Sequence, residues 1–327
     1  MKRRDFITLI GGAAAAAWPL AARAQQVPVI GVLYSGNSEA LQEDFAAFRD
    51  GLAETGLVEG RNVAFEFRMA ESHLDRLPAL ADDLVRRRVA VIFSGSNAAP
   101  TLAAKAATTT IPIVFFMGAD PVELGVVASL AHPGGNITGV TVLAAELFGK
   151  RLELLHEIAP NVSKIAYLVN PTNRAFSESL LSEQTEAAHG LGLQLTILNA
   201  SIPSDIDRAF TVMSEEGLGA MLVGPDTFFQ AQRDQIVTLA ARYKIPASYS
   251  RRADAAAGGL ISYGSDFPDA YHRIGVYAGR ILGGENPKDL PVQQPTKFKL
   301  VVNLKAARQI GIEMPPALIT RADEVIE

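Results

Sequence analysis

A chain of 327 residues with 48% hydrophobic and 20% charged side chains can bury a sizeable core, and its length suits two domains better than one. Its formal net charge of −5 argues against nucleic acid or an anionic membrane surface as the partner. Cysteine is absent, which excludes disulfide bonds, thiol chemistry and a cysteine-ligated metal.

The first 24 residues have the three parts of an export signal. Residues 2–4 supply a basic start, residues 8–20 form a short apolar run, and residues 22–24 (ARA) match a small-residue cleavage site. The paired arginines favour the twin-arginine version. Because the apolar run is shorter than the roughly 20 residues of a membrane-spanning helix, a cleaved signal is preferred over an uncleaved tether. We therefore expect residues 25–327 to work in the periplasm.

Short β-branched runs alternate with amphipathic helices along the first part of the chain. Strands are predicted at residues 27–34, 63–67, 89–93 and 111–116, and apolar residues recur at helical spacing between them. Strands separated by helices in this way predict a parallel sheet with helices on both faces.

A similar order of elements follows after residue 160. Residues 162–173 (VSKIAYLVNPTN) parallel residues 27–37 (VPVIGVLYSGN), and Ile111-Pro112 recurs as Ile245-Pro246. The repeat predicts two similar α/β lobes, although a chance alignment of generic βαβ units would give the same pattern.

The elements after Gly258 do not make a third lobe. They are best placed if the chain crosses back to the first lobe near Gly264 and returns to the second near Pro295. The predicted fold class is α/β, with two doubly wound parallel-sheet lobes, a three-crossing hinge and a cleft between the lobes. The first lobe comprises residues 25–143 and 265–295, and the second comprises residues 144–264 and 296–327.

Polar side chains gather where the predicted strands end. In open parallel sheets, ligands bind at the carboxyl ends of the strands, where loops and helix N-termini supply unpaired N–H groups. The hydroxyls, amides, carboxylates and rings at these ends suit a small polar or zwitterionic molecule. The candidate ligand-binding residues are Tyr34, Ser35, Ser94, Ser96, Asp120, Asn170, Asp226, Phe228 and Tyr263.

Each candidate also has a purely structural interpretation. Serines after strands are commonly turn formers or helix caps. Asp120 and Asp226 would cap the helices that follow them, Asn170 would form a turn before its proline, and Tyr263 would belong to the core.

The sequence contains none of the common catalytic or cofactor motifs. G-x-G-x-x-G, G-x-x-x-x-G-K-[ST] and G-x-S-x-G are all missing. His156-Glu157 begins like a zinc-binding helix, but Pro160 stands where the second histidine would be needed. We therefore expect no catalytic residues, no metal and no cofactor.

Three longer segments carry a family resemblance. Residues 120–141 (DPVELGVVASLAHPGGNITGVT), 258–266 (GGLISYGSD) and 290–315 resemble the ABC-transporter substrate-binding lipoprotein-like family. Its better-known members are tryptophan- or tyrosine-binding proteins of the type 1 periplasmic binding fold. The resemblance extends to the closing residues 321–327 (RADEVIE) and covers essentially all of the chain after the signal.

The resemblance implies a two-lobed, hinge-closing receptor that delivers a solute to a membrane permease and its ATPase. We expect the protein to be a monomer and its solute to be a small carboxylate-bearing molecule, an amino acid or an aromatic acid. In similar proteins, strand-end serines and acids hold the α-carboxylate and α-ammonium of the ligand, which supports the candidates above, with Phe228 as a wall. Lipid-anchored relatives carry a cysteine at the cleavage site, and its absence here implies a free periplasmic protein. Two alternatives are a ligand-presenting sensor and a periplasmic enzyme that uses Asp120 or Asp226 as a base.

Overall fold

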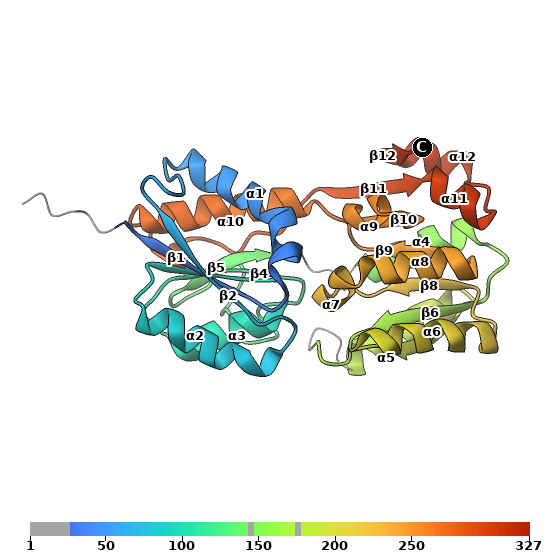
Figure 1. Cartoon of the computed structure of the whole chain (residues 1–327), viewed down its shortest axis with the longest axis horizontal. Helices are drawn as coiled ribbons and strands as arrows, with labels where there is room; N and C mark the ends of the chain where they lie inside the picture. The colour runs from blue at the N-terminus through green and yellow to red at the C-terminus, as the bar shows by residue number, and fades with distance from the viewer. Residues whose placement is uncertain (1–26, 143–146, 174–177) are drawn as a thin grey trace, which may run out of the picture.

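The structure is a computed structural model, and it describes residues 27–142, 147–173 and 178–327. The described residues form two α/β lobes that lie side by side (Figure 1). The predicted export signal lies outside the described residues. No helix within the described part of the chain is both long and apolar enough to cross a membrane.

The sheet of the first lobe has five parallel strands among the described residues, in the order β2-β1-β3-β4-β5. Helices α1 and α10 lie on one face of this sheet, and α2 and α3 lie on the other (Figure 1). The elements are β1 (Val29–Tyr34), α1 (Ser38–Glu54), β2 (Ala64–Met69), η1 (Leu74–Arg76), α2 (Leu77–Arg86), β3 (Val91–Gly95), α3 (Ala98–Ala107), β4 (Ile113–Met117), β5 (Ile137–Thr141), α10 (Phe267–Leu282) and η3 (Pro287–Asp289).

The sheet of the second lobe has seven strands among the described residues, in the order β12-β11-β10-β9-β8-β6-β7. Helices α6 and α8 pack on one face, and α4 and α5 pack on the other. The elements are α4 (Phe148–Ile158), β6 (Lys164–Val169), α5 (Glu178–Gly190), β7 (Gln194–Asn199), α6 (Pro203–Glu216), β8 (Ala220–Val223), α7 (Thr227–Ala231), α8 (Arg233–Tyr243), β9 (Ala247–Tyr249), α9 (Arg252–Ala256), β10 (Ile261–Ser265), β11 (Phe298–Asn303), α11 (Leu304–Ile310), α12 (Pro316–Arg321) and β12 (Glu324–Ile326).

The apolar pattern of the sequence explains these layers. All residues of β3 and β4 are buried, as expected for strands of a parallel sheet with both faces covered. Helix α1 turns its regularly spaced apolar residues inward, and the rings of Phe45 and Phe48 stack at 4.9 Å. Helix α10 lies so close to α1 that a side chain at Gly275 would collide with the backbone of Phe48. This helix is therefore anchored to the first lobe although it follows a strand of the second.

The chain passes between the lobes three times: between β5 and α4, between β10 and α10, and between η3 and β11. The predicted fold class with its three-crossing hinge is confirmed. The second sheet is not purely parallel, because β11 pairs antiparallel with β10 and β12 runs parallel to β11. Strand β10 runs toward the first lobe and β11 returns from it, so the two neighbours must point in opposite directions.

Candidate ligand-binding cleft

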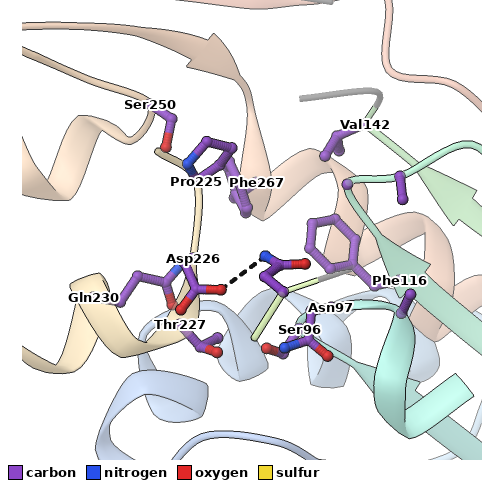
Figure 2. A pocket seen from close by; sticks show the side chains of 14 residues that line it. Ser96, Asn97, Phe116, Val142, Pro225, Asp226, Thr227, Gln230, Ser250 and Phe267 are labelled. Carbon is purple, nitrogen blue, oxygen red and sulfur yellow. Dashed lines mark hydrogen bonds between the residues drawn. The ribbon is translucent and has the colours of Figure 1, made fainter. Parts of the chain in front are cut away.

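A cleft lies between the lobes, at the carboxyl ends of strands from both sheets (Figure 2). It encloses about 570 Å³ that protein atoms do not occupy, including its open mouth. The first lobe contributes Ser96, Asn97, Ala98, Phe116, Gly118, Ala119, Val142 and Phe267. The second lobe contributes Asn173, Pro225, Asp226, Thr227, Gln230 and Ser250.

The first lobe supplies an aromatic wall. Phe116 is the next-to-last residue of β4 and Phe267 begins α10, and their ring centroids lie 5.4 Å apart. Val142 extends this apolar surface (Figure 2). The wall suits the apolar body of a small molecule, and an aromatic ring would gain edge or offset contacts there.

The first lobe also points the N-terminus of α3 at the cleft. Asn97 caps this helix by accepting a hydrogen bond from the Ala99 N–H at 3.0 Å. The preceding residue, Ser96, has a φ of 101°, which is rare for a residue other than glycine and costs backbone strain. The hydroxyls of Ser96 and Ser35 lie 2.7 Å apart and hold this turn in place. The partial positive charge of the helix N-terminus favours an anionic group on the ligand.

The second lobe supplies a carboxylate, Asp226, which directly precedes α7. Its Oδ1 accepts hydrogen bonds from Asn170 Nδ2 at 2.9 Å and from the Phe228 N–H at 2.8 Å. Its Oδ2 accepts one from Asn173 Nδ2 at 2.7 Å, the dashed bond of Figure 2. Burial raises the pKa of Asp226, and the three neutral donors oppose that rise. Each carboxylate oxygen can accept two bonds, so Oδ2 can accept one more from a ligand.

Asp226 is the only ionisable side chain among the cleft-lining residues that the structure describes. The cleft therefore combines one carboxylate on the second lobe with a helix N-terminus and two phenylalanine rings on the first. This arrangement is complementary to a molecule that carries an ammonium, an anionic group and an apolar side chain.

The lobes also contact each other directly beside the cleft. Asp44 on α1 and Arg251 after β9 form an ion pair in which both residues are buried. Burial alone would lower the pKa of Arg251, but Asp44, together with Tyr34 and Asp254, outweighs it and raises that pKa. The Arg251 guanidinium lies 4.2 Å from the ring centroid of Phe267. The hydroxyls of Ser35 and Thr227 approach to 3.4 Å across the same boundary.

Two of the residues predicted from the sequence, Ser96 and Asp226, line the cleft. Three more of the predicted residues do not line the cleft but form hydrogen bonds with these two. Asn170 binds Asp226, Ser35 binds Ser96, and the buried Tyr34 hydrogen-bonds to Ser96 and Tyr271. Burial raises the pKa of Tyr34 to about 12, so its hydroxyl stays protonated.

The other four predicted residues lie away from the cleft. The Ser94 hydroxyl lies 3.0 Å from that of Thr101 inside the first lobe, because its position in β3 directs it toward α3. Asp120 caps its own turn through the Val122 N–H at 2.7 Å. Phe228 is buried in the core of the second lobe. Tyr263 stacks on Phe298 across the β10–β11 pair at 6.1 Å.

Several cleft residues were not among the predicted ones, and the signals for them differ. Asn173 belongs to the NPTN turn that also holds Asn170, and Gln230 lies one helical turn after Asp226. Both residues could have been predicted from the sequence if the first helical turn after each strand had been included among the candidate positions. Phe267 is different, because only the return of the chain to the first lobe brings it to the cleft.

The fold and the cleft define a two-lobed protein that binds a small molecule between its lobes. A model of the family described as ABC transporter substrate binding protein matches residues 26–326, and the chain belongs to this family. The family consists of binding proteins rather than enzymes, so the alternative of an enzyme that uses Asp120 or Asp226 as a base is wrong.

Individual relatives agree with this assignment. The tyrosine-binding protein of Clostridioides difficile (strain R20291) is 24% identical over 284 residues, which are 87% of this chain and 81% of that protein. A conserved domain protein of Vibrio cholerae O1 biovar El Tor is 28% identical, with a TM-score of 0.84 over 92% of this chain and 100% of that one. An ABC domain in complex with L-Trp from Streptococcus pneumonia is 26% identical, with a TM-score of 0.81 over 91% of this chain and 99% of that one.

Proposed function

We propose that this protein is the periplasmic solute-binding component of an ABC importer and that its cleft binds an amino acid. The observation that carries the proposal is the charge of the cleft, in which Asp226 is the only ionisable group among the described lining residues. An aromatic acid without an ammonium would bring a second negative charge near Asp226 with no cationic side chain in the lining to compensate for it. An amino acid carries both charges that the cleft can satisfy.

The proposed pose follows from the two walls. The α-ammonium donates to Asp226 Oδ2, which has one acceptor position left. The α-carboxylate lies at the N-terminus of α3, near Ser96 and Asn97. The side chain packs on Phe116 and Phe267. The L-Trp complex and the tyrosine-binding relative support an aromatic side chain.

Binding couples to closure because the ligand groups are divided between the lobes. The proposed lobes, residues 25–143 with 265–295 and residues 144–264 with 296–327, turn relative to each other about the three crossings. A ligand that contacts both of them shifts the population toward the closed form. A dissociation constant of about 1 μM corresponds to about −8 kcal/mol net of the cost of closure. The closed monomer then docks on a permease with its ATPase, after export through the N-terminal signal.

Isothermal titration with a set of matched compounds tests the proposal. L-Phenylalanine, L-tyrosine and L-tryptophan are compared with 3-phenylpropionate, which lacks the ammonium, and phenethylamine, which lacks the carboxylate. We expect at least one amino acid to bind and both truncated compounds to bind about 100-fold more weakly or worse, since each lacks one charge-assisted contact. Equal binding of 3-phenylpropionate and the amino acids would contradict the proposed role of Asp226.

A matched pair of variants sharpens this test. Asp226→Asn keeps the shape of the side chain but removes its charge, and we expect it to weaken amino-acid binding tenfold or more. Asp120→Asn makes the same change at the strand-end aspartate whose carboxylate caps a turn outside the cleft. We expect this control to bind normally.

A further inference from the structure

A second and smaller cavity lies in the second lobe, directly beside the cleft. Its walls come from the ends of β8 and β9 and from α7, α8 and α9. Asp226, Gln230 and Ser250 line both this cavity and the cleft, so these three residues lie between the two spaces. We call it the Tyr249 cavity, after the tyrosine that forms part of its wall. It has room for about one water-sized group.

Two neutral side chains on the wall of the Tyr249 cavity each have a polar atom without a hydrogen-bond partner. One such atom is the hydroxyl of Tyr249, a residue that is only 1% exposed, and the other is the side-chain oxygen of Gln230. A buried polar atom without a partner costs about 1–3 kcal/mol, and native proteins rarely leave such atoms unpaired. A hydrogen-bonding group that enters the cavity would remove this cost.

The chemistry of the wall selects a neutral group. Arg233 and Asp254 are already paired, with Arg233 Nε 2.9 Å from Asp254 Oδ1. Arg251, which also lines the cavity, pairs with Asp44. Burial, with a smaller contribution from Asp254, raises the pKa of Tyr249, so its hydroxyl stays protonated. The cavity therefore offers a neutral hydroxyl and an amide oxygen to an incoming group.

The Tyr249 ring is held rigidly in its position. A Cβ atom added at Gly259 would lie 2.7 Å from Cε2 of this ring, so the backbone at Gly259 packs directly against it. Gln230 is less confined, because it also lines an outer hollow at the rim between α1 and α8. Because Gln230 lines both spaces, movement of its side chain would join the cavity to the cleft, whereas the Tyr249 ring stays packed against Gly259.

We propose that the Tyr249 cavity is a specificity subsite that accepts one neutral hydrogen-bonding group, a hydroxyl or a ring N–H, from the side chain of the bound solute. The inference rests on the proposed function, because it takes the solute to be an amino acid in the cleft. The preference for a solute with such a group over one without it follows from the two unpaired atoms of the cavity wall. A solute that lacks the polar group leaves them unsatisfied, and a site built in this way rejects the smaller analogue strongly.

Two amino acids that differ by a single hydroxyl test the subsite. Titrations with L-tyrosine and L-phenylalanine are compared for the unaltered protein, Tyr249→Phe and Tyr263→Phe. The first substitution deletes a buried hydroxyl that has no partner, so the variant should fold at least as stably as the parent. The second makes the same change at a tyrosine in the middle of β10 that lines neither space.

We expect the unaltered protein to prefer L-tyrosine by tenfold or more. Tyr249→Phe should bring this ratio close to one while it changes the affinity for L-phenylalanine less than threefold, and Tyr263→Phe should leave the ratio unchanged. Equal affinities of the unaltered protein for the two amino acids, or an equal loss for both in Tyr249→Phe, would overturn the subsite and indicate that water alone fills the cavity. A protein that binds neither these nor other amino acids would instead contradict the proposed function, and the subsite with it.

Discussion

The two walls of the cleft are built from different chemistry although both lie at the carboxyl ends of parallel strands. The wall of the first lobe consists of two phenylalanine rings and the N-terminus of α3. The wall of the second lobe consists of Asp226, the side-chain amides that donate to it, and hydroxyl groups. Neither wall alone can satisfy a zwitterion with an apolar side chain. The comparison indicates that affinity depends on bringing the walls together, so changes at the lobe boundary should matter as much as changes in the walls.

The ion pair at the lobe boundary gives the largest expected effect. Asp44→Asn removes the carboxylate that pairs with the buried Arg251 whenever the lobes close. Breaking a buried pair in this way costs about 3–5 kcal/mol, which opening of the lobes relieves. We expect ligand affinity to fall about 100-fold or more and the ligand-free protein to expand in small-angle X-ray scattering.

Asp50→Asn is the control for this prediction, because Asp50 lies on the same helix and is exposed. It should leave both measurements unchanged. Normal affinity and an unchanged scattering profile for Asp44→Asn would show that the pair does not hold the closed form.

The aromatic wall gives an intermediate effect. Phe116→Leu keeps an apolar side chain but removes the ring that faces Phe267. Aromatic pairs contribute about 0.5–1.5 kcal/mol beyond their buried area, so an aromatic amino acid should bind roughly three- to tenfold more weakly. Titration calorimetry measures the change.

Phe298→Leu removes a ring that stacks on Tyr263 outside the cleft and should not affect binding. If an aromatic amino acid bound Phe116→Leu as tightly as the parent, its side chain would have to lie elsewhere.

A change of pH, which acts through the ionisation of Asp226, gives the smallest effect near neutral pH, and this effect grows with acidity. Burial raises the pKa of Asp226 above 3.8, and only the ionised carboxylate attracts an ammonium. Affinity should therefore fall as the pH falls through this raised pKa, by at most about tenfold per pH unit. Stability has the opposite sign: a raised carboxyl pKa means that the folded state binds the proton more tightly, so this residue favours folding at low pH.

Asp226→Asn should remove both of these pH dependences. Titrations and thermal unfolding of the parent and the variant over the same pH series measure them. Parallel curves for the two proteins would show that Asp226 does not titrate in this way.

The alternation of strands and helices was sufficient to predict the fold, because both faces of each sheet are covered and the apolar runs are therefore long. The direction of β11 and the strands β5 and β7 were not predicted. The direction of β11 follows from where the chain re-enters the second lobe, which is a long-range property that local patterns do not contain.

The site was predictable where a strand end leads straight into the cleft, as at Ser96 and Asp226. It was not predictable where residues that are close in sequence face different parts of the structure. Tyr263 lies in β10 and packs on β11, whereas Phe267, four residues later, begins the helix that returns to the first lobe and lines the cleft. Ser94 and Ser96 also face different parts of the structure. Ser94 is still within β3 and faces α3, while the turn at Ser96 reaches the cleft.

A crystal structure of the protein with a bound aromatic amino acid tests the central claim most directly. We expect the α-ammonium within hydrogen-bond distance of Asp226 Oδ2, the α-carboxylate at the N-terminus of α3, and both lobes in contact with the ligand. A ligand held by one lobe alone, or one whose carboxylate points toward Asp226, would contradict this account.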